Sequence, residues 1–244
     1  MLEVNQVTGG YFNLPVLKEI SFSVKKHEIV GLIGLNGAGK STTIKEIIGF
    51  LHPYKGEILL DGQKLQEDAV TYRKKIGYIP ETPMLYDELT LREHLEIIAM
   101  AYEKDLDQAL ERLAPYLQRF RLDQKLDWLP AEFSKGMKQK VMILCAILVD
   151  PDLYIVDEPF LGLDPLAIED LLQFLLEERK KGKGVLMSTH VLDTAERVCD
   201  RYILLHQGQV LAEGSLPDIQ EQFQLPGQSL HDIYLRVTQE DQHA

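Results

Sequence analysis

The chain has 244 residues, of which 45% are hydrophobic, and its formal net charge is −12 at pH 7. This acidity argues against a protein that coats nucleic acid, because such a surface needs a basic field. No apolar stretch reaches the roughly 18 residues that cross a bilayer, and the first residues lack the basic and apolar segments of a signal peptide. We therefore expect a cytosolic protein with one large domain. Cys145 and Cys199 are interpreted as core thiols.

Short apolar runs open the chain and are predicted as strands over residues 2–7, 20–24 and 29–33. A helix is predicted from about Ser41 to Leu51, ending before Pro53. A further strand over residues 56–63 enters an Asp-Gly turn, and residues 76–79 form another short strand.

Residues 34–41 read Gly-Leu-Asn-Gly-Ala-Gly-Lys-Ser, the pattern of a phosphate-binding loop between a predicted strand and a predicted helix. Its glycines allow the backbone to curl with the N–H groups pointing inward, and the helix start adds about half a positive charge. Lys40 then places an ammonium against the β and γ phosphates, and the Ser41 hydroxyl is a ligand for Mg²⁺. A chance glycine-rich turn is the alternative, which the flanking strand and helix disfavour. The predicted nucleotide-binding residues here are Asn36, Gly37, Ala38, Gly39, Lys40, Ser41 and Thr42.

From Leu89 to Val149 helical periodicity dominates, and Thr90 with Glu93 forms a capping-box pattern. Strands are predicted again over residues 153–156, 185–188 and 202–205. A helix between the first two makes a strand–helix–strand unit, which indicates a parallel sheet. The tail past Leu216 is short and polar, and no chemistry is assigned to it.

Two adjacent carboxylates, Asp157 and Glu158, end the predicted strand at residues 153–156. In P-loop proteins a carboxylate at this place holds Mg²⁺, usually through water, and Asp157 suits that role. Because the chain turns at the strand end, Glu158 can face the γ-phosphate and polarise the attacking water. The alternative is an acidic helix cap after a buried strand.

Residues 133–140 read Phe-Ser-Lys-Gly-Met-Lys-Gln-Lys. Together with the phosphate loop and the paired carboxylates, this segment resembles the signature motif of ABC ATPases, most often Leu-Ser-Gly-Gly-Gln. Ser134 and Gly136 are kept, and in the family these two contact phosphate at a helix N-terminus. Lys135 replaces the first glycine and Met137 the glutamine, so the match is imperfect.

The resemblance extends from Tyr11 to about Gly214 and implies roles for further residues. It implies that Tyr11 stacks on adenine and that His190 contacts the γ-phosphate. Glu81 stands where the family usually has a glutamine that links the metal site to the helical insert. Residues 161–164, Leu-Gly-Leu-Asp, resemble the loop that crosses between subunits.

The implied fold is an α/β P-loop NTPase of ABC type, with a mixed, largely parallel sheet core, an N-terminal antiparallel β region and an inserted helical lobe. The expected single domain spans residues 1–244, with a core at 1–87 and 151–215, a helical part at about 88–150 and an extension at 216–244. The implied cofactors are ATP and Mg²⁺. The expected catalytic residues are Glu158, His190 and Lys40, and the expected metal ligands are Ser41, Glu81 and Asp157.

In the family two such domains face each other head to tail, so that Ser134 and Gly136 of one close over nucleotide on the other. A homodimer is favoured, since one chain carries both the phosphate loop and the signature segment that together form a nucleotide site. Within the family, the sequence is similar to ATPase subunits of bacterial ABC-2-like exporters, in particular the Ecs-type transporters of Gram-positive bacteria, which are associated with peptide export. This implies a membrane-spanning permease partner and a peripheral place on the inner face of the cell membrane.

A short helix of that permease is expected to dock on the helical insert near Met84, Leu85 and Tyr86, although ordinary core packing is the alternative for these three. A soluble ABC ATPase acting on ribosomes or DNA, a P-loop kinase or GTPase, and an ATP-sensing regulatory subunit remain as alternative functions. The histidines other than His190 are interpreted as solvated side chains.

Overall fold

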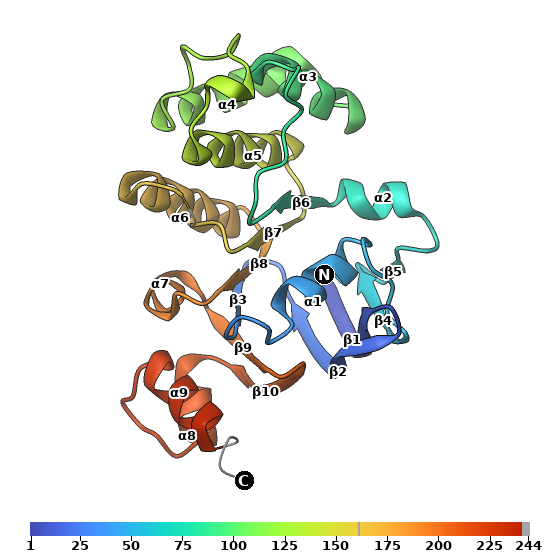
Figure 1. Ribbon diagram of the computed structural model, residues 1–244, viewed down its shortest axis with the longest axis vertical. Coiled ribbons are helices and arrows are strands. Elements are labelled where there is room, and N and C mark those ends of the chain that lie inside the picture. Colours follow the sequence, from blue (N-terminus) through green and yellow to red (C-terminus); the bar gives the residue numbers. More distant parts are fainter. Residues whose placement is uncertain (161, 241–244) are drawn as a thin grey trace.

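The computed structural model describes residues 1–160 and 162–240. Figure 1 shows helices α3 to α5 at one end of the long axis and α8 and α9 at the other, with the sheets between them. The strands are β1 (Leu2–Tyr11), β2 (Leu14–Val24), β3 (Ile29–Ile33), β4 (Lys55–Leu60), β5 (Gln63–Lys64), β6 (Ile76–Ile79), β7 (Leu153–Asp157), β8 (Gly184–Thr189), β9 (Arg201–His206) and β10 (Gln209–Gly214). The helices are α1 (Lys40–Ile47), α2 (Ala69–Lys74), α3 (Leu91–Ala101), α4 (Leu106–Arg119), α5 (Lys135–Val149), α6 (Pro165–Lys180), α7 (Leu192–Val198), α8 (Leu216–Gln222) and α9 (Leu230–Glu240), with a 3₁₀ turn at Pro130–Glu132.

The central sheet has the order β10-β9-β3-β8-β7-β6 and is parallel from β9 to β6, with only β10 antiparallel to its neighbour. Every residue of β3, β7 and β8 is buried, which explains their continuous apolar runs. The predicted parallel sheet is therefore confirmed. Because the strands run the same way, the segments after β3, β7 and β8 meet at one edge of the sheet.

The second sheet is antiparallel, with the order β2-β1-β4-β5, as predicted for the N-terminal part. Its first two strands are longer than the predicted ones, because β1 and β2 continue through bulges until Tyr11 pairs with Leu14. Phe12 and Asn13 form the turn between them with φ angles of 49° and 65°. A two-residue turn with both φ angles positive matches the twist of a hairpin, which allows the pairing to run to its end.

Helix α1 ends at Ile47, four residues before the predicted end. The reason is Gly49, which takes a left-handed φ of 78°. The N–H groups of Phe50 and Leu51 then donate to the carbonyl of Lys45 and close the helix.

The helical insert forms as predicted, with α3 and α4 packed on α5. Thr90 and Glu93 make the predicted capping box at the start of α3. His94 differs from its prediction, because it is buried and not solvated. Its Nε2 accepts from the backbone N–H of Tyr86 at 2.9 Å, and its Nδ1 lies 2.7 Å from the carbonyl oxygen of Thr90. His94 thereby ties the loop that precedes α3 to the helix.

The C-terminal tail is short and rich in polar residues, but helices with a buried apolar face were not predicted for it from the sequence. It forms α8 and α9, which bury Ile219, Leu230, Ile233 and Tyr234 in a cluster with Ile33. The spacing of three and four residues within α9 is the helical pattern that places these side chains on one face.

Glu46 on α1 is a buried carboxyl group that destabilises the fold when it is ionised. It is 3% exposed, and neither of its oxygens has a hydrogen-bond partner. Burial raises the pKa of Glu46 from 4.5 to about 7. The folded chain therefore binds this proton more tightly than the unfolded chain. The resulting stabilisation is complete below pH 4.5 and is lost as the pH rises through 7.

Replacing Glu46 by glutamine is expected to remove this dependence, because the amide is neutral at every pH. Between pH 5 and pH 8 the free energy of unfolding of the unchanged protein should fall by about 2–3 kcal/mol relative to the variant. Urea unfolding at several pH values measures the difference, with Glu221→Gln as an exposed control. Parallel pH profiles for the unchanged protein and Glu46→Gln would contradict this account.

Candidate active site

A cavity of about 610 Å³ opens at the edge where β3, β7 and β8 end. It brings together the phosphate loop, Glu81, Glu158 and His190, which are far apart in the sequence. The residues that line it are Val16, Leu35, Asn36, Gly37, Gly39, Lys40, Ser41, Thr42, Glu81, Glu158, Phe160, His190 and Val191.

The phosphate loop connects β3 to α1, and its shape depends on Gly37 and Gly39, whose φ angles are 84° and 113°. A side chain at Gly39 would also place its Cβ 2.8 Å from Leu17. Lys40 follows at the first position of α1 and is buried. Its Nζ donates to the carbonyl of Gly34 at 2.7 Å, so the ammonium lies inside the curl of the loop. A helix N-terminus and a buried cation together favour a bound polyanion.

Asp157 ends β7 directly before Glu158, which lines the cavity, and does not line the cavity itself. It is buried, and the hydroxyl of Ser188 on the neighbouring β8 donates to its Oδ1 at 2.5 Å. Burial is the main reason that the pKa of Asp157 is raised, and the charges of Glu158 and Glu81 add to the effect. A bound cation would relieve this cost, which is what a metal-holding carboxylate requires.

Glu158 is the next residue, and its φ of 43° turns the side chain out of the strand. Its Oε1 lies 3.2 Å from Nζ of Lys40, and its Oε2 lies 2.8 Å from Nδ1 of His190. The backbone N–H of Glu158 donates to the Ser188 hydroxyl at 3.1 Å, which fixes the turn. The site therefore holds a carboxylate between a lysine and a histidine at the mouth of the phosphate loop.

Five of the predicted site residues do not line the cavity: the buried Asp157 described above, and Tyr11, Ala38, Ser134 and Gly136. Ala38 is buried within the phosphate loop. The hydroxyl of Tyr11 is hydrogen-bonded to Nζ of Lys45 at 3.2 Å, and Val16 lines the cavity on that side. Ser134 and Gly136 belong to the start of α5, outside the cavity.

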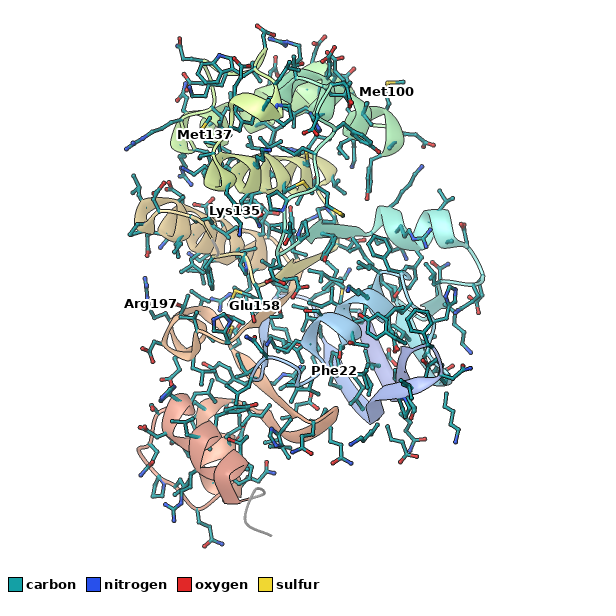
Figure 2. The ribbon with its side chains drawn as sticks, in the orientation of Figure 1. Phe22, Met100, Lys135, Met137, Glu158 and Arg197 are labelled. Carbon is teal, nitrogen blue, oxygen red and sulfur yellow. The ribbon has the colours of Figure 1, made fainter. Side chains whose placement is uncertain are left out.

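The segment with Ser134 and Gly136 has a helix N-terminus that is open to solvent. Ser134 is the N-cap of α5, and its Oγ accepts from the N–H of Met137 at 3.3 Å. A Cβ on Gly136 would fall 2.3 Å from the carbonyl oxygen of Gly162, so only glycine fits there. Figure 2 shows Lys135 toward the helical lobe and Glu158 at the edge of the parallel sheet. Leu161, in the predicted crossing loop, lies outside the described residues.

A family model described as ABC transporter matches residues 17–161. The chain belongs to the ABC transporter ATP-binding family. The ABC-type transporter ATP-binding protein EcsA of Bacillus subtilis (strain 168) is 57% identical over 241 residues, which cover 99% of this chain and 98% of that protein. A solved structure of an ATP-binding subunit of an ABC transporter has a TM-score of 0.95 and 55% identity, covering 98% of this chain and 99% of the other.

A further structure is the ATP-binding cassette MJ0796, a dimer in a post-hydrolysis state with ADP and Pi. It has a TM-score of 0.79 and 27% identity, and the match covers 88% of this ABC ATPase and 99% of that chain. These findings confirm the predicted family, the ABC-type P-loop fold and the ATPase activity. This ABC ATPase binds nucleotide, and subunits of its family dimerise and work with membrane permeases. In residues 1–160 and 162–240, no helix combines the length and apolar character that a membrane span requires.

Two residues that shape the site in this ABC ATPase were not predicted from the sequence. Ser188 holds both Asp157 and the backbone of Glu158. Gln139 on α5 is fully buried and donates from Nε2 to the carbonyl of Pro80 at 2.8 Å, which joins the helix of Ser134 to the loop of Glu81. A polar residue at the end of an apolar buried run is the signal that marks Ser188, although it does not name its partners. Gln139 lies between two lysines in the sequence, and no local signal marks it.

Proposed function

We propose that the chain is the ATP-hydrolysing subunit of an exporter, and that two copies bind two ATP molecules between them. The single observation that carries this proposal is the position of Ser134 and Gly136. Ser134 is exposed and Gly136 half-buried at the N-terminus of α5, yet neither lines the cavity that contains Lys40 and Glu158. A second copy turned head to tail would bring this anion-binding terminus onto the nucleotide of the first.

In this proposal the phosphate loop binds the triphosphate, with Lys40 moving from the Gly34 carbonyl to the β and γ phosphates. The N–H groups and hydroxyls of residues 36–42 complete the cradle. Tyr11, at the end of β1, supplies a ring for the adenine. Glu158 accepts a proton from the attacking water, and His190, 2.8 Å from that carboxylate, stabilises the charge that develops on the γ-phosphate.

The residues at the edge of the sheet fit a Mg²⁺ ion. Ser41 and Glu81 line the cavity with oxygen atoms, and Asp157 is a buried carboxylate whose pKa is raised because burial removes its water. These three would hold the ion, whose charge would neutralise the phosphate oxygens. Gln139 would carry movement of the Glu81 loop to α5, and hence to Ser134.

We further propose that residues 1–244 act as one ABC ATPase domain, that the dimer is a homodimer, and that a peptide is the exported substrate. The permease would hold the subunit on the cytoplasmic face of the membrane. Its docking surface is the loop before α3 together with α3, where Met84, Tyr86 and Met100 are 65%, 65% and 78% exposed. Figure 2 places Met100 at the outer edge of the helical lobe. Leu85 instead packs against the core, so the three predicted groove residues divide between surface and core.

The double substitution Met84→Glu and Tyr86→Asp tests this docking surface. Two buried charges at the centre of an apolar interface are expected to lower the fraction of the chain that sediments with native membranes by roughly tenfold or more. Leu14→Glu, an exposed apolar residue on the β1–β2 hairpin, is the matched control. Melting temperatures establish that both proteins are folded. Equal sedimentation of the double variant and the control would contradict the surface, and ATPase activity without any membrane retention would favour a soluble ABC ATPase.

A further inference from the structure

The C-terminal helix α9 reaches the phosphate loop through one side chain. Tyr234 is 2% exposed, and its hydroxyl accepts a hydrogen bond from the backbone N–H of Leu35 at 3.0 Å. The same hydroxyl donates to the carbonyl of Leu205, at the end of β9, at 3.1 Å. Burial raises the pKa of Tyr234, so the phenol stays neutral and keeps the proton that it donates.

Tyr234 and Lys40 both form hydrogen bonds with the same peptide group, the one between Gly34 and Leu35. The N–H of Leu35 and the carbonyl of Gly34 belong to one planar unit, and Nζ of Lys40 donates to that carbonyl at 2.7 Å. Lys40 in turn lies 3.2 Å from Glu158. A continuous chain of polar contacts therefore runs from Leu205 through Tyr234 and the first peptide of the loop to the lysine and the carboxylate. In a buried chain of this kind each bond polarises the next.

The rest of α9 is built to keep Tyr234 in place. Leu230 and Ile233 are fully buried in the cluster that contains Ile33, the last residue of β3 before the loop. The N–H of Leu230 donates to Glu196 on α7 at 2.6 Å, and α7 begins two residues after His190. The helix thus touches the segments on both sides of the cavity.

We propose that Tyr234 is a positioning residue for nucleotide binding, which makes the C-terminal helix a working part of the active site. The hydroxyl fixes the orientation of the Gly34–Leu35 peptide and so the shape of the loop that receives the phosphates. The inference rests on the ATP site proposed above. The new element is that α9, which lies outside the residues 17–161 matched by the family model, is needed for full affinity for nucleotide.

Tyr234→Phe tests the inference, because it removes only the hydroxyl and keeps the ring in its cluster. It leaves a buried N–H and a buried carbonyl without this partner, and a net hydrogen bond of this kind corresponds to a change of about 3- to 10-fold in affinity. The dissociation constant for ADP and the KM for ATP are expected to rise by that factor, with kcat changed by less than about twofold. The loop is expected to bind the phosphates equally in the ground state and in the transition state. Weaker binding by the loop should therefore raise KM and leave kcat unchanged.

Thr238→Val is the matched control. Thr238 is buried on the same helix, one turn after Tyr234, and its hydroxyl donates to the carbonyl of Tyr234 at 2.8 Å. Removing this hydroxyl changes the same buried helix without touching the phosphate loop, so KM and the ADP dissociation constant should stay unchanged. If Tyr234→Phe left both constants unchanged, or if Thr238→Val raised them equally, Tyr234 would be merely structural and the inference wrong. Tyr234 and the phosphate loop belong to the same copy of the chain, so this readout stays valid even if the proposed dimer or exporter role fails.

Discussion

Replacing Glu158 by glutamine is expected to lower steady-state ATP hydrolysis by about 10²- to 10⁴-fold, the range of a general base. The substitution keeps the size of the side chain and removes its ability to take a proton. It also removes a negative charge 3.2 Å from Lys40, so ATP binding should be kept or strengthened. Phosphate release and equilibrium ATP binding, measured on the same preparation, separate the two effects.

Glu169→Gln is the matched control, because Glu169 is also paired, here with Arg197 at 2.7 Å, on the outside of α6. An exposed ion pair contributes little to stability, and this one lies away from the cavity. The control should hydrolyse ATP at the unchanged rate. If Glu158→Gln retained a tenth or more of the activity, the proton would be going elsewhere and the assignment of Glu158 would be wrong.

The second large effect is expected at Lys40. Its ammonium is buried in the loop and has a carbonyl partner that it can exchange for phosphate. Lys40→Ala removes a buried cation from beside a bound polyanion, which should weaken ATP binding by about 100-fold or more. Isothermal titration with ATP and Mg²⁺ measures the change, and competition with ADP extends the range to weak binding.

Lys74→Ala provides the comparison for Lys40→Ala. Lys74 lies at the end of α2 and pairs with Glu103 at 2.8 Å, away from the cavity. It should bind ATP as the unchanged protein does. An ATP affinity of Lys40→Ala within about fivefold of the unchanged protein would show that the loop holds phosphate without its lysine, against the charge argument.

The sequence was most informative where a motif and its neighbouring elements have to agree. The phosphate loop requires glycine at positions 37 and 39, and it requires a strand before it and a helix after it. This one stretch of sequence therefore predicted both the type of fold and the position of the nucleotide site. Asp157 ends one buried strand of the parallel sheet, Glu158 and His190 each directly follow a buried strand, and parallel strands end at the same edge. Their meeting around Lys40 was therefore predictable without knowledge of any distance.

The contacts that the sequence did not predict join segments that no local pattern connects. Tyr234 binds the loop 199 residues before it, and its α9 pattern of buried residues was hidden in a tail with many polar side chains. His94 was interpreted as solvated because no motif surrounds it, yet two backbone groups satisfy both of its nitrogens. Such partners depend on how elements pack in three dimensions, which periodicity alone does not determine.

The central claim is that two copies of this chain enclose ATP together, one copy contributing the phosphate loop and Glu158 and the other contributing Ser134 and Gly136. The most direct test is the mass of Glu158→Gln in solution, by light scattering during gel filtration, with and without ATP and Mg²⁺. We predict a single chain without nucleotide and twice that mass with it, and a return to one chain when Ser134→Arg places a bulky cation at the proposed contact. A protein that binds ATP but keeps the mass of one chain at every concentration tested would contradict the claim.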